Sequence, residues 1–513
     1  MTRPNIVVIM ADQLAPHFTG AYGHPLVQTP HMDALAARGA RFDAAYCNAP
    51  LCAPSRFSFM SGQLVTRIAA YDNASEFPAT IPTFAHYLRQ AGYRTCLSGK
   101  MHFVGPDQLH GFEERLTTDI YPADHAWTPD WELPDERIDS FYHNMDAVKT
   151  AGKAATTFQI EYDEETAFLA RRRIFEYAMQ KVDPFCMVVS FIHPHDPYVA
   201  RPEWWDLYDH DAVDMPGDAP PPDPHTLRLM KGIEADSVAV SDGEVRNARH
   251  AYYANTSYFD SKIGAVVQAL EESDQLDNTV VIVTADHGDM LGERGLWYKM
   301  TFFEHSARVP LIMAGPGLSQ RIVETPCSLV DVLPTLLDIA GVDDKHLGTP
   351  IDGSSVWGYA TGAVSDTAEE AGVVIGEYCA ELAPATPVFM IRRGRWKYIH
   401  CDADPPQLYD LFADPGEREN LAGVDDYTQI SNDFAAEVRE RWNSKKIAAD
   451  VIATQKQRRA VHAAMQSGAL TSWDYQPPRD AANEFVRNHV SWDDVLHRMQ
   501  YPAPGADTSG ADK

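Results

Sequence analysis

The sequence predicts an α/β fold in which one large mixed β-sheet lies between layers of helices, followed by a smaller α+β subdomain and an extended tail. Short apolar, β-branched runs alternate with helix-period segments over most of the chain. Near residue 374 the pattern changes to short, closely spaced strands, and after residue 461 it becomes rich in Trp, Pro and His. We therefore expect an α/β domain over residues 1–373, an α+β subdomain over 374–460 and a tail over 461–513.

The large sheet is predicted from apolar runs that are bounded by polar or turn residues. Runs of this kind are typical of parallel strands buried on both faces by helices. The runs lie at 5–10, 186–192, 279–284 and 310–314. The segments with helical periodicity that alternate with them lie at 30–39, 83–92, 164–180 and 249–272.

The subdomain is predicted from a β-hairpin and a charged helix. Strand-like residues at 389–392 and 396–401 flank an Arg393-Gly394-Arg395 turn. A charged segment near 433–446 has the composition of a surface helix.

Composition excludes several classes of partner. The 513 residues include 43 Lys and Arg against 73 Asp and Glu, a net charge of −30, which repels nucleic acid and anionic membranes. The N-terminus lacks the pattern of a signal peptide, and no apolar run reaches membrane-spanning length. The seven cysteines are thinly spaced and form no CxxC pair, which argues against a disulfide framework or a zinc ribbon. We expect a cytoplasmic protein.

The most informative motif is Cys52-Ala53-Pro54-Ser55-Arg56. Proline suits the first position of a helix, so Pro54 places Cys52 at a helix N-terminus, where free N–H groups and the helix dipole favour an anion. An isolated cysteine at a helix start is more often a buried structural residue. Whether Cys52 is functional or structural therefore depends on the other motifs of the chain.

Acidic residues and a histidine follow two of the predicted strands. Asp12 follows the run 6–10, and Asp286 and His287 follow the run 280–284. Ligands of an open α/β sheet gather at such strand ends, and two carboxylates with one imidazole make an oxygen-rich site for Ca²⁺, Mg²⁺ or Mn²⁺. The alternative for each single aspartate is a helix cap.

Three further motifs carry basic residues: Gly99-Lys100-Met101-His102, Pro194-His195-Asp196-Pro197 and a segment over 291–299 that ends in Lys299. Together with the Cys52 motif, and in this order along the chain, they resemble the sulfatase family. The resemblance implies the alkaline-phosphatase-like form of the α/β sandwich. It also implies that a maturation enzyme oxidises Cys52 to formylglycine, whose hydrated aldehyde is the nucleophile.

The same resemblance assigns roles to individual residues. It implies one divalent cation, calcium ahead of magnesium or manganese, held by Asp12, Cys52, Asp286 and His287. It places Arg56, Lys100, His102, His195 and Lys299 around the transferred sulfuryl group, where positive donors stabilise developing charge. His195 or Lys299 would protonate the leaving group, and His102 would deprotonate the second hydroxyl of the nucleophile. Many sulfatases have a second acidic residue where this chain has Gln13, so the number of protein ligands stays open.

A narrower resemblance, to choline sulfatases, covers about residues 4–502. It rests on the segments 107–115, 193–201, 408–411 and 473–477. This resemblance implies hydrolysis of choline sulfate to choline and inorganic sulfate. A quaternary ammonium has no N–H to donate, so a protein holds it with aromatic faces and carboxylates. The candidates are Trp127, His143, Glu381 and Asp493; core packing is the alternative for Trp127, and a solvated acid or helix cap for Asp493.

The tail raises the question of assembly. Trp473, Tyr475, Phe485 and Trp492 make it too aromatic to be left in solvent. It either covers its own subunit or reaches a neighbouring one, and the second arrangement would bring Asp493 to another chain's substrate site in a dimer or tetramer.

Two rival functions remain at this point. One is a phosphonate monoester or phosphodiester hydrolase of the same superfamily, which acts on tetrahedral anions of similar shape. The other is a catalytically silent binding protein for choline esters, which would result if Cys52 stays unmodified.

Overall fold

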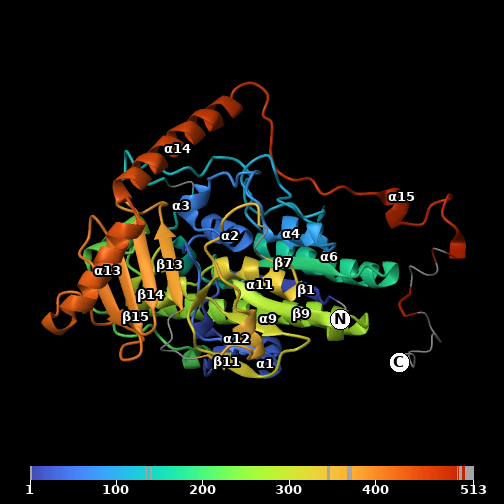
Figure 1. Ribbon diagram of the computed structural model, residues 1–513, viewed down its shortest axis with the longest axis horizontal. Helices are drawn as coiled ribbons and strands as arrows, with labels where there is room; N and C mark the ends of the chain where they lie inside the picture. Colours follow the sequence, from blue (N-terminus) through green and yellow to red (C-terminus); the bar gives the residue numbers. More distant parts are fainter. Residues whose placement is uncertain are drawn as a thin grey trace.

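The computed structural model describes residues 3–134, 136–138, 141–343, 347–366, 372–493, 495 and 500–502. Its centre is an eight-stranded mixed sheet (Figure 1). In spatial order the strands are β11 (Arg321–Val323), β2 (Ala40–Phe42), β10 (Leu311–Ala314), β9 (Thr279–Ala285), β1 (Asn5–Asp12), β7 (Phe185–Pro194), β4 (Arg94–Gly99) and β5 (Glu114–Arg115). The prediction of a large mixed sheet is confirmed.

The middle of this sheet is parallel and buried. β1 pairs in parallel with β7 on one side and with β9 on the other, and every residue of these three strands is buried. The prediction that residues 310–314 form another parallel strand was wrong, because β10 pairs antiparallel with both β9 and β2. An apolar run shows burial on both faces but carries no information on direction.

Helices flank the sheet in two groups. α6 (Phe158–Gln180) and the 31-residue α9 (Asp242–Glu272) pack on each other and on β7. α4 (Phe84–Gln90), α11 (Val332–Ile339) and α2 (Cys52–Ser61) form the second group, and α4 contacts β4. α1 (Pro30–Ala37) packs on β10 and α9. These helices bury both faces of the apolar strands.

A second, antiparallel sheet lies beside the first (Figure 1). Its strands in spatial order are β13 (Val373–Tyr378), β14 (Val388–Arg393), β15 (Trp396–Cys401) and β16 (Gln407–Asp410). The predicted hairpin is confirmed, with β14 and β15 joined through Gly394 and Arg395. α13 (Thr428–Arg441) packs on β15, where Phe434 and Val438 complete a small separate core.

The charged segment near 433–446 is two helices and not one. α13 ends at Arg441, and α14 (Ser444–Met465) begins after Trp442 and an Asn443 side chain that accepts a hydrogen bond from the Lys446 amide. α14 runs across residue 460, and the tail then extends along the body as an irregular chain with a short helix, α15 (Ala481–Glu484) (Figure 1). The domain boundaries taken from the sequence stay predictions.

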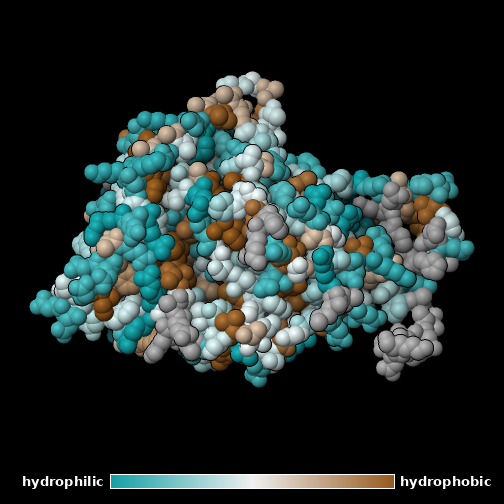
Figure 2. Space-filling model, in the orientation of Figure 1, coloured by the Kyte–Doolittle hydropathy of each residue, from teal (hydrophilic) through white to brown (hydrophobic). Residues whose placement is uncertain are grey.

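The visible surface is mainly hydrophilic, with scattered hydrophobic residues (Figure 2). Among the described residues, no helix combines the length and the apolar composition needed to cross a membrane. All seven cysteines are buried and free.

Candidate active site

The C-terminal ends of four parallel strands bring the predicted residues together. Asp12 ends β1, Lys100 follows β4, His195 follows β7, and Asp286 and His287 follow β9. Gly99 makes this convergence possible, because its φ is +99° and a Cβ atom would lie 1.9 Å from the Ser190 carbonyl oxygen of β7. The site therefore lies at the edge where open α/β sheets bind their ligands.

Cys52 is the first residue of α2, as the motif predicted. Pro54 is the third helical residue and not the first, so the prediction of its position was wrong; the first turn tolerates a missing N–H at either place. Burial, reinforced by the neighbouring Asp12 carboxylate, raises the pKa of the Cys52 thiol to about 12. The unmodified thiol is therefore neutral at physiological pH and a poor nucleophile.

Three buried side chains surround Cys52, and the four together converge on one point. One ligand atom from each of Asp12, Cys52, Asp286 and His287 lies within 4.8 Å of the others. The Cys52 Sγ atom is 3.7 Å from Asp12 Oδ1 and 3.3 Å from His287 Nε2. His287 Nδ1 lies 3.0 Å from the Gly288 carbonyl oxygen, an arrangement that leaves Nε2 free to bind a metal. The donor set fits a hard divalent cation.

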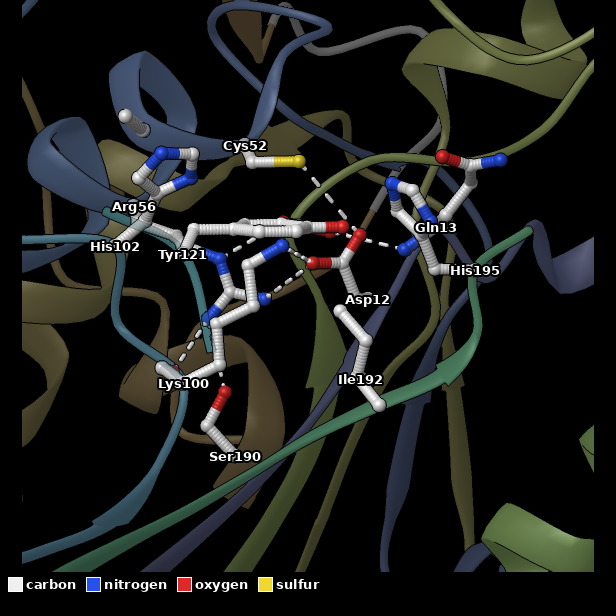
Figure 3. A network of polar contacts seen from close by, with 12 residues as sticks. Asp12, Gln13, Cys52, Arg56, Lys100, His102, Tyr121, Ser190, Ile192 and His195 are labelled. Carbon is white, nitrogen blue, oxygen red and sulfur yellow. Dashed lines mark hydrogen bonds and ion pairs between the residues drawn. The ribbon is translucent and has the colours of Figure 1, made fainter. Parts of the chain in front are cut away.

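Arg56 is buried and fully partnered. Its guanidinium donates to Asp286 Oδ2 at 2.8 Å, Asp12 Oδ2 at 3.2 Å, the Lys100 carbonyl oxygen at 2.8 Å and Ser190 Oγ at 2.8 Å. Lys100 also forms an ion pair with Asp12 (Figure 3). Burial alone would raise the pKa of Asp12, yet Lys100, His195 and Arg56 together hold it well below its usual range. Asp12 is therefore ionised, as a metal ligand must be.

His195 and Lys299 form a hydrogen-bonded pair. His195 Nδ1 lies 2.6 Å from the Asp196 carbonyl oxygen, so Nε2 accepts a hydrogen bond from Lys299 Nζ at 2.8 Å. Burial, together with the Lys299 charge, lowers the pKa of His195 to about 3, and Lys299 keeps a raised pKa despite its burial. Lys299 is therefore the charged member of the pair.

Gln13 links Lys299 to two further acidic residues, Asp196 and Asp289. Its Oε1 accepts a hydrogen bond from Lys299, and its Nε2 donates to Asp289 Oδ2 at 2.7 Å and Asp196 Oδ1 at 3.2 Å. Its backbone has a left-handed φ of 64°. The side-chain amide of Gln13 therefore points towards Lys299, Asp289 and Asp196.

An aromatic recess adjoins these polar groups. The Trp127 ring lies 5.8 Å from His102 and stacks on Phe141 at 6.3 Å, and Phe141 in turn contacts Tyr142 at 4.8 Å. Glu381 is 5% exposed, and its Oε2 atom has no hydrogen-bond partner. Burial, reinforced by the charge of Asp72, raises the pKa of Glu381 to about 7. Glu381 helps to raise the pKa of Tyr142, and the Tyr378 hydroxyl donates to the Glu381 carbonyl oxygen, so this buried carboxyl group lies near aromatic side chains and is suited to an organic cation.

The other two candidates for substrate binding differ in placement. His143 stacks on Tyr298 at 4.3 Å, lies 5.8 Å from His195 and has its Nδ1 3.4 Å from Asp196 Oδ2. Asp493 is exposed on the tail, where its backbone amide bonds to Ser491 Oγ. The structure thus brings His143 to the cluster, whereas among the described residues Asp493 has no polar contact with a residue of the site.

Comparison with known families matches residues 4–342 to the family described as Sulfatase. The chain belongs to the sulfatase family. Residues 292–444 match the C-terminal family of N-sulphoglucosamine sulphohydrolase, and residues 449–501 match the family described as choline sulfatase enzyme C terminal. The protein is therefore a sulfuric ester hydrolase.

Similar proteins agree with this assignment. The sulfatase is 46% identical to a choline-sulfatase of Rhizobium meliloti (strain 1021), over 98% of this chain and 99% of the relative. It is 30% identical to arylsulfatase K of Danio rerio, over 82% of this chain and 80% of that one. The crystal structure of phosphonate monoester hydrolase of Agrobacterium radiobacter shares the fold, with a TM-score of 0.67 and 25% identity over 85% of this chain and 95% of that chain. The alkaline-phosphatase-like fold is thereby confirmed.

The sulfatase site also contains a residue that the sequence did not reveal. The Tyr121 ring lies across the middle of the cluster, with Lys100 Nζ 4.3 Å from the ring centroid (Figure 3). It contacts His102 at 5.2 Å, Trp127 at 5.0 Å and His195 at 6.2 Å. Tyr121 lies in an irregular segment without periodicity, so no sequence signal marked it.

Proposed function

We propose that this sulfatase hydrolyses choline sulfate to choline and inorganic sulfate. The observation that carries the proposal is the contact between two unlike regions: a cationic, metal-ligating cluster for the sulfate, and an aromatic recess with a buried carboxyl group for the ammonium. Tyr121 and Trp127 connect the two regions through ring contacts of 5.0–5.8 Å with each other and with His102. The 46% identity to a choline-sulfatase supports the same substrate.

The nucleophile in this proposal is formylglycine at position 52. Its hydrated aldehyde has two hydroxyl groups, one to attack sulfur and one whose deprotonation expels sulfate. A divalent cation held by Asp12, residue 52, Asp286 and His287 would lower the pKa of the attacking hydroxyl and neutralise charge on the sulfuryl oxygens. We favour Ca²⁺, as the resemblance to sulfatases implies, and a ligand set dominated by oxygen fits it.

The chain's own residues prepare this site. Arg56 holds the carboxylates of Asp12 and Asp286 in position, since it donates to both. Lys100 adds a positive charge beside Asp12, where a sulfuryl oxygen would approach. His102 is buried, and both of its ring nitrogens lack a hydrogen-bond partner. It is therefore available to take the proton of the second hydroxyl.

The leaving group needs a proton, because choline departs as a poor alkoxide. When the bond between sulfur and the ester oxygen breaks, that oxygen takes a proton and choline leaves as the alcohol. Lys299 is the donor we assign, since it is charged and donates to His195 Nε2. His195 orients the Lys299 ammonium, and the lysine takes up a new proton from water after turnover.

Trp127 and Glu381 hold the ammonium in this proposal. The ring face attracts the cation, and the ionised carboxylate supplies the opposite charge. His143 extends the site on the side of Asp196.

We also propose the assembly predicted from the tail: a homo-oligomer in which Asp493 of one chain completes the ammonium site of another. Three side chains of the tail have large exposed fractions, namely Leu470 (68%), Phe485 (59%) and Trp492 (60%), and these support an intermolecular contact. A formylglycine-generating enzyme is the second partner that the proposal requires. The cytoplasmic location stays a prediction.

The test compares kcat/KM for choline sulfate with that for its neutral isostere, 3,3-dimethylbutyl sulfate, and for an aryl sulfate and a phosphodiester. We expect choline sulfate to be preferred, and Trp127→Ala to reduce its kcat/KM by about 2- to 30-fold, the equivalent of 0.5–2 kcal/mol, with a much smaller effect on the isostere. Trp357→Ala, a half-buried tryptophan at the start of α12 (Trp357–Thr361), is the matched control. A preference for the phosphodiester, or equal losses on both sulfates, would refute the proposal.

A further inference from the structure

A crevice of about 560 Å³ separates the large-sheet domain from the antiparallel C-terminal sheet. Its walls come from five parts of the chain that the catalytic site does not use. They include His17 after β1, Asp43 after β2, Arg308 at the end of α10 (Glu304–Ala307), Arg392 of β14 and Phe412 after β16.

Two arginines of this crevice, Arg308 and Arg392, form no ion pair within 4 Å among the described residues, although both help to lower the pKa of the Glu304 carboxyl group in the same crevice. The Arg308 Nε atom is buried and forms no hydrogen bond. Arg392 donates only to neutral oxygens, those of the Tyr46 hydroxyl and the Gly394 carbonyl. Guanidinium groups of this kind are suited to the carboxylate of a bound anion.

Two of the three acidic residues of the crevice form ion pairs with cations other than these arginines. Asp43 forms an ion pair with Arg41 at 2.7 Å. Glu304 forms an ion pair with Lys397 at 2.9 Å, and Glu417, behind the wall, contacts the same lysine at 2.8 Å. Glu324, the remaining acid, is exposed at the rim.

A second wall is flat and aromatic. The imidazoles of His17 and His305 stack with centroids 4.1 Å apart at 24°. Burial, reinforced by the stacked His305 imidazole and by the positive charges of Arg308 and Lys397, holds the pKa of His17 well below its usual range. His17 is therefore neutral, and its buried Nδ1 atom has no partner. The exposed ring of Phe412 borders the same space.

We propose that this crevice is a second ligand site, separate from the catalytic centre, which binds a small organic anion with a planar apolar body. Arg308 and Arg392 bind its carboxylate or other acidic group. The stacked imidazoles and Phe412 pack against its flat part.

The probe for this site is benzoate, with benzamide as the neutral molecule of the same shape. Isothermal titration of the full-length enzyme at pH 7 should show benzoate binding with an affinity at least about tenfold higher than that of benzamide. Arg308→Gln should weaken benzoate at least about fivefold, because it removes one charged contact. Arg38→Gln, an exposed arginine of a different crevice, changes the net charge equally and should leave the affinity unaltered.

Phe412→Ala provides an independent test at an exposed position, in case Arg308→Gln fails to fold. We expect it to weaken benzoate without a change in the melting temperature. The proposal is overturned if benzamide binds as well as benzoate, or if the folded Arg308 and Phe412 variants retain wild-type affinity. Benzoate binding in the catalytic centre would give this second result, because neither residue lies there.

Discussion

At the scale of single residues, the site depends on charges that are buried only because each is paired. The Arg56 side chain has no exposed surface and so has no contact with water. Its guanidinium instead donates hydrogen bonds to oxygen atoms of two carboxylates, a hydroxyl group and a backbone carbonyl group. Removing one partner would leave a buried charge uncompensated, which is far more costly than losing one hydrogen bond. Substitutions in this cluster therefore need folding controls as well as activity assays.

Cys52→Ala should reduce choline sulfate turnover by about a thousandfold or more, because alanine has no thiol group that can be oxidised to formylglycine. The buried cavity it leaves is small, so the protein should remain folded by circular dichroism. Peptide mass spectrometry of the wild type should show an aldehyde or its hydrate at position 52. Cys52→Ser should also lose turnover, since a serine sulfate ester has no second hydroxyl to expel sulfate. An active Cys52→Ala variant would end the hypothesis.

Asp286→Ala should lower metal affinity by at least about 100-fold, since even residues behind the direct ligands contribute 10- to 100-fold. Metal analysis after dialysis and the rate of hydrolysis should fall together. Asp402→Ala, which removes an exposed acid of the second sheet, should change neither. Full metal occupancy and a normal rate in Asp286→Ala would show that the site is elsewhere.

Glu381 should give choline recognition a pH dependence. Its pKa is raised to about 7, so the carboxyl group becomes neutral as the pH falls through 7 and no longer attracts the ammonium. We expect KM for choline sulfate to rise between pH 8 and pH 6, whereas KM for 3,3-dimethylbutyl sulfate changes little. Glu381→Gln should raise KM at pH 8 and flatten this profile. A wild-type profile that Glu381→Gln leaves unaltered would assign the titration to another group.

At the scale of elements, the sequence predicted the strand ends well because burial on both faces leaves a strong apolar signal. Asp12, Asp286 and His287 were identified because each follows such a run directly. The parallel order of β1, β7 and β9 then brought them together, as expected for this class of sheet.

What the sequence could not predict depends on tertiary contacts. The antiparallel direction of β10 is set by its pairing with β9 and β2 and not by its composition. The break between α13 and α14 is stabilised by Trp442, which stacks on Phe389 of the second sheet at 4.2 Å. Tyr121 reaches the site from an irregular segment that is anchored by Asp119, whose carboxylate accepts from the Met101 and His102 amides. No pattern in the local sequence indicates any of these contacts.

α14 connects the C-terminal part of the chain to the ammonium recess. Arg458 forms a bidentate pair with the buried Asp72, at 2.5 and 2.7 Å. Gln455 accepts a hydrogen bond from the Trp131 amide, and the Trp131 indole donates to the carbonyl oxygen of Ala380, next to Glu381. The recess is thus supported by a helix that precedes the tail.

At the scale of the whole molecule, the tail lies outside the two packed sheets (Figure 1). It is tied to its own subunit where Trp473 contacts His125 at 5.3 Å, where Asp474 accepts from the Ala123 amide and where Arg115 lies over Tyr475. Beyond this anchor, Phe485 and Trp492 are exposed, and hydrophobic residues are visible on the part of the tail that projects from the body (Figure 2). Tyr501 contacts the same subunit again, with its ring 6.1 Å from that of Phe175, so the exposed Phe485 and Trp492 lie between two attachment points. Exposed apolar side chains on such a segment are suited to contact with a second subunit.

Truncation after Gly468 should therefore raise KM for choline sulfate and shift the particle towards monomer in sedimentation velocity. Asp493→Ala should raise KM alone, because it removes a charge from the ammonium site and leaves the apolar contacts of the arm in place. Asp480→Ala, a second aspartate of the tail, is the control for the loss of charge. The effect of Asp493→Ala should be small for 3,3-dimethylbutyl sulfate, since that substrate carries no ammonium. A truncated enzyme that stays oligomeric and hydrolyses choline sulfate normally would remove both roles from the tail, while a truncated monomer with normal KM would leave assembly as its only role.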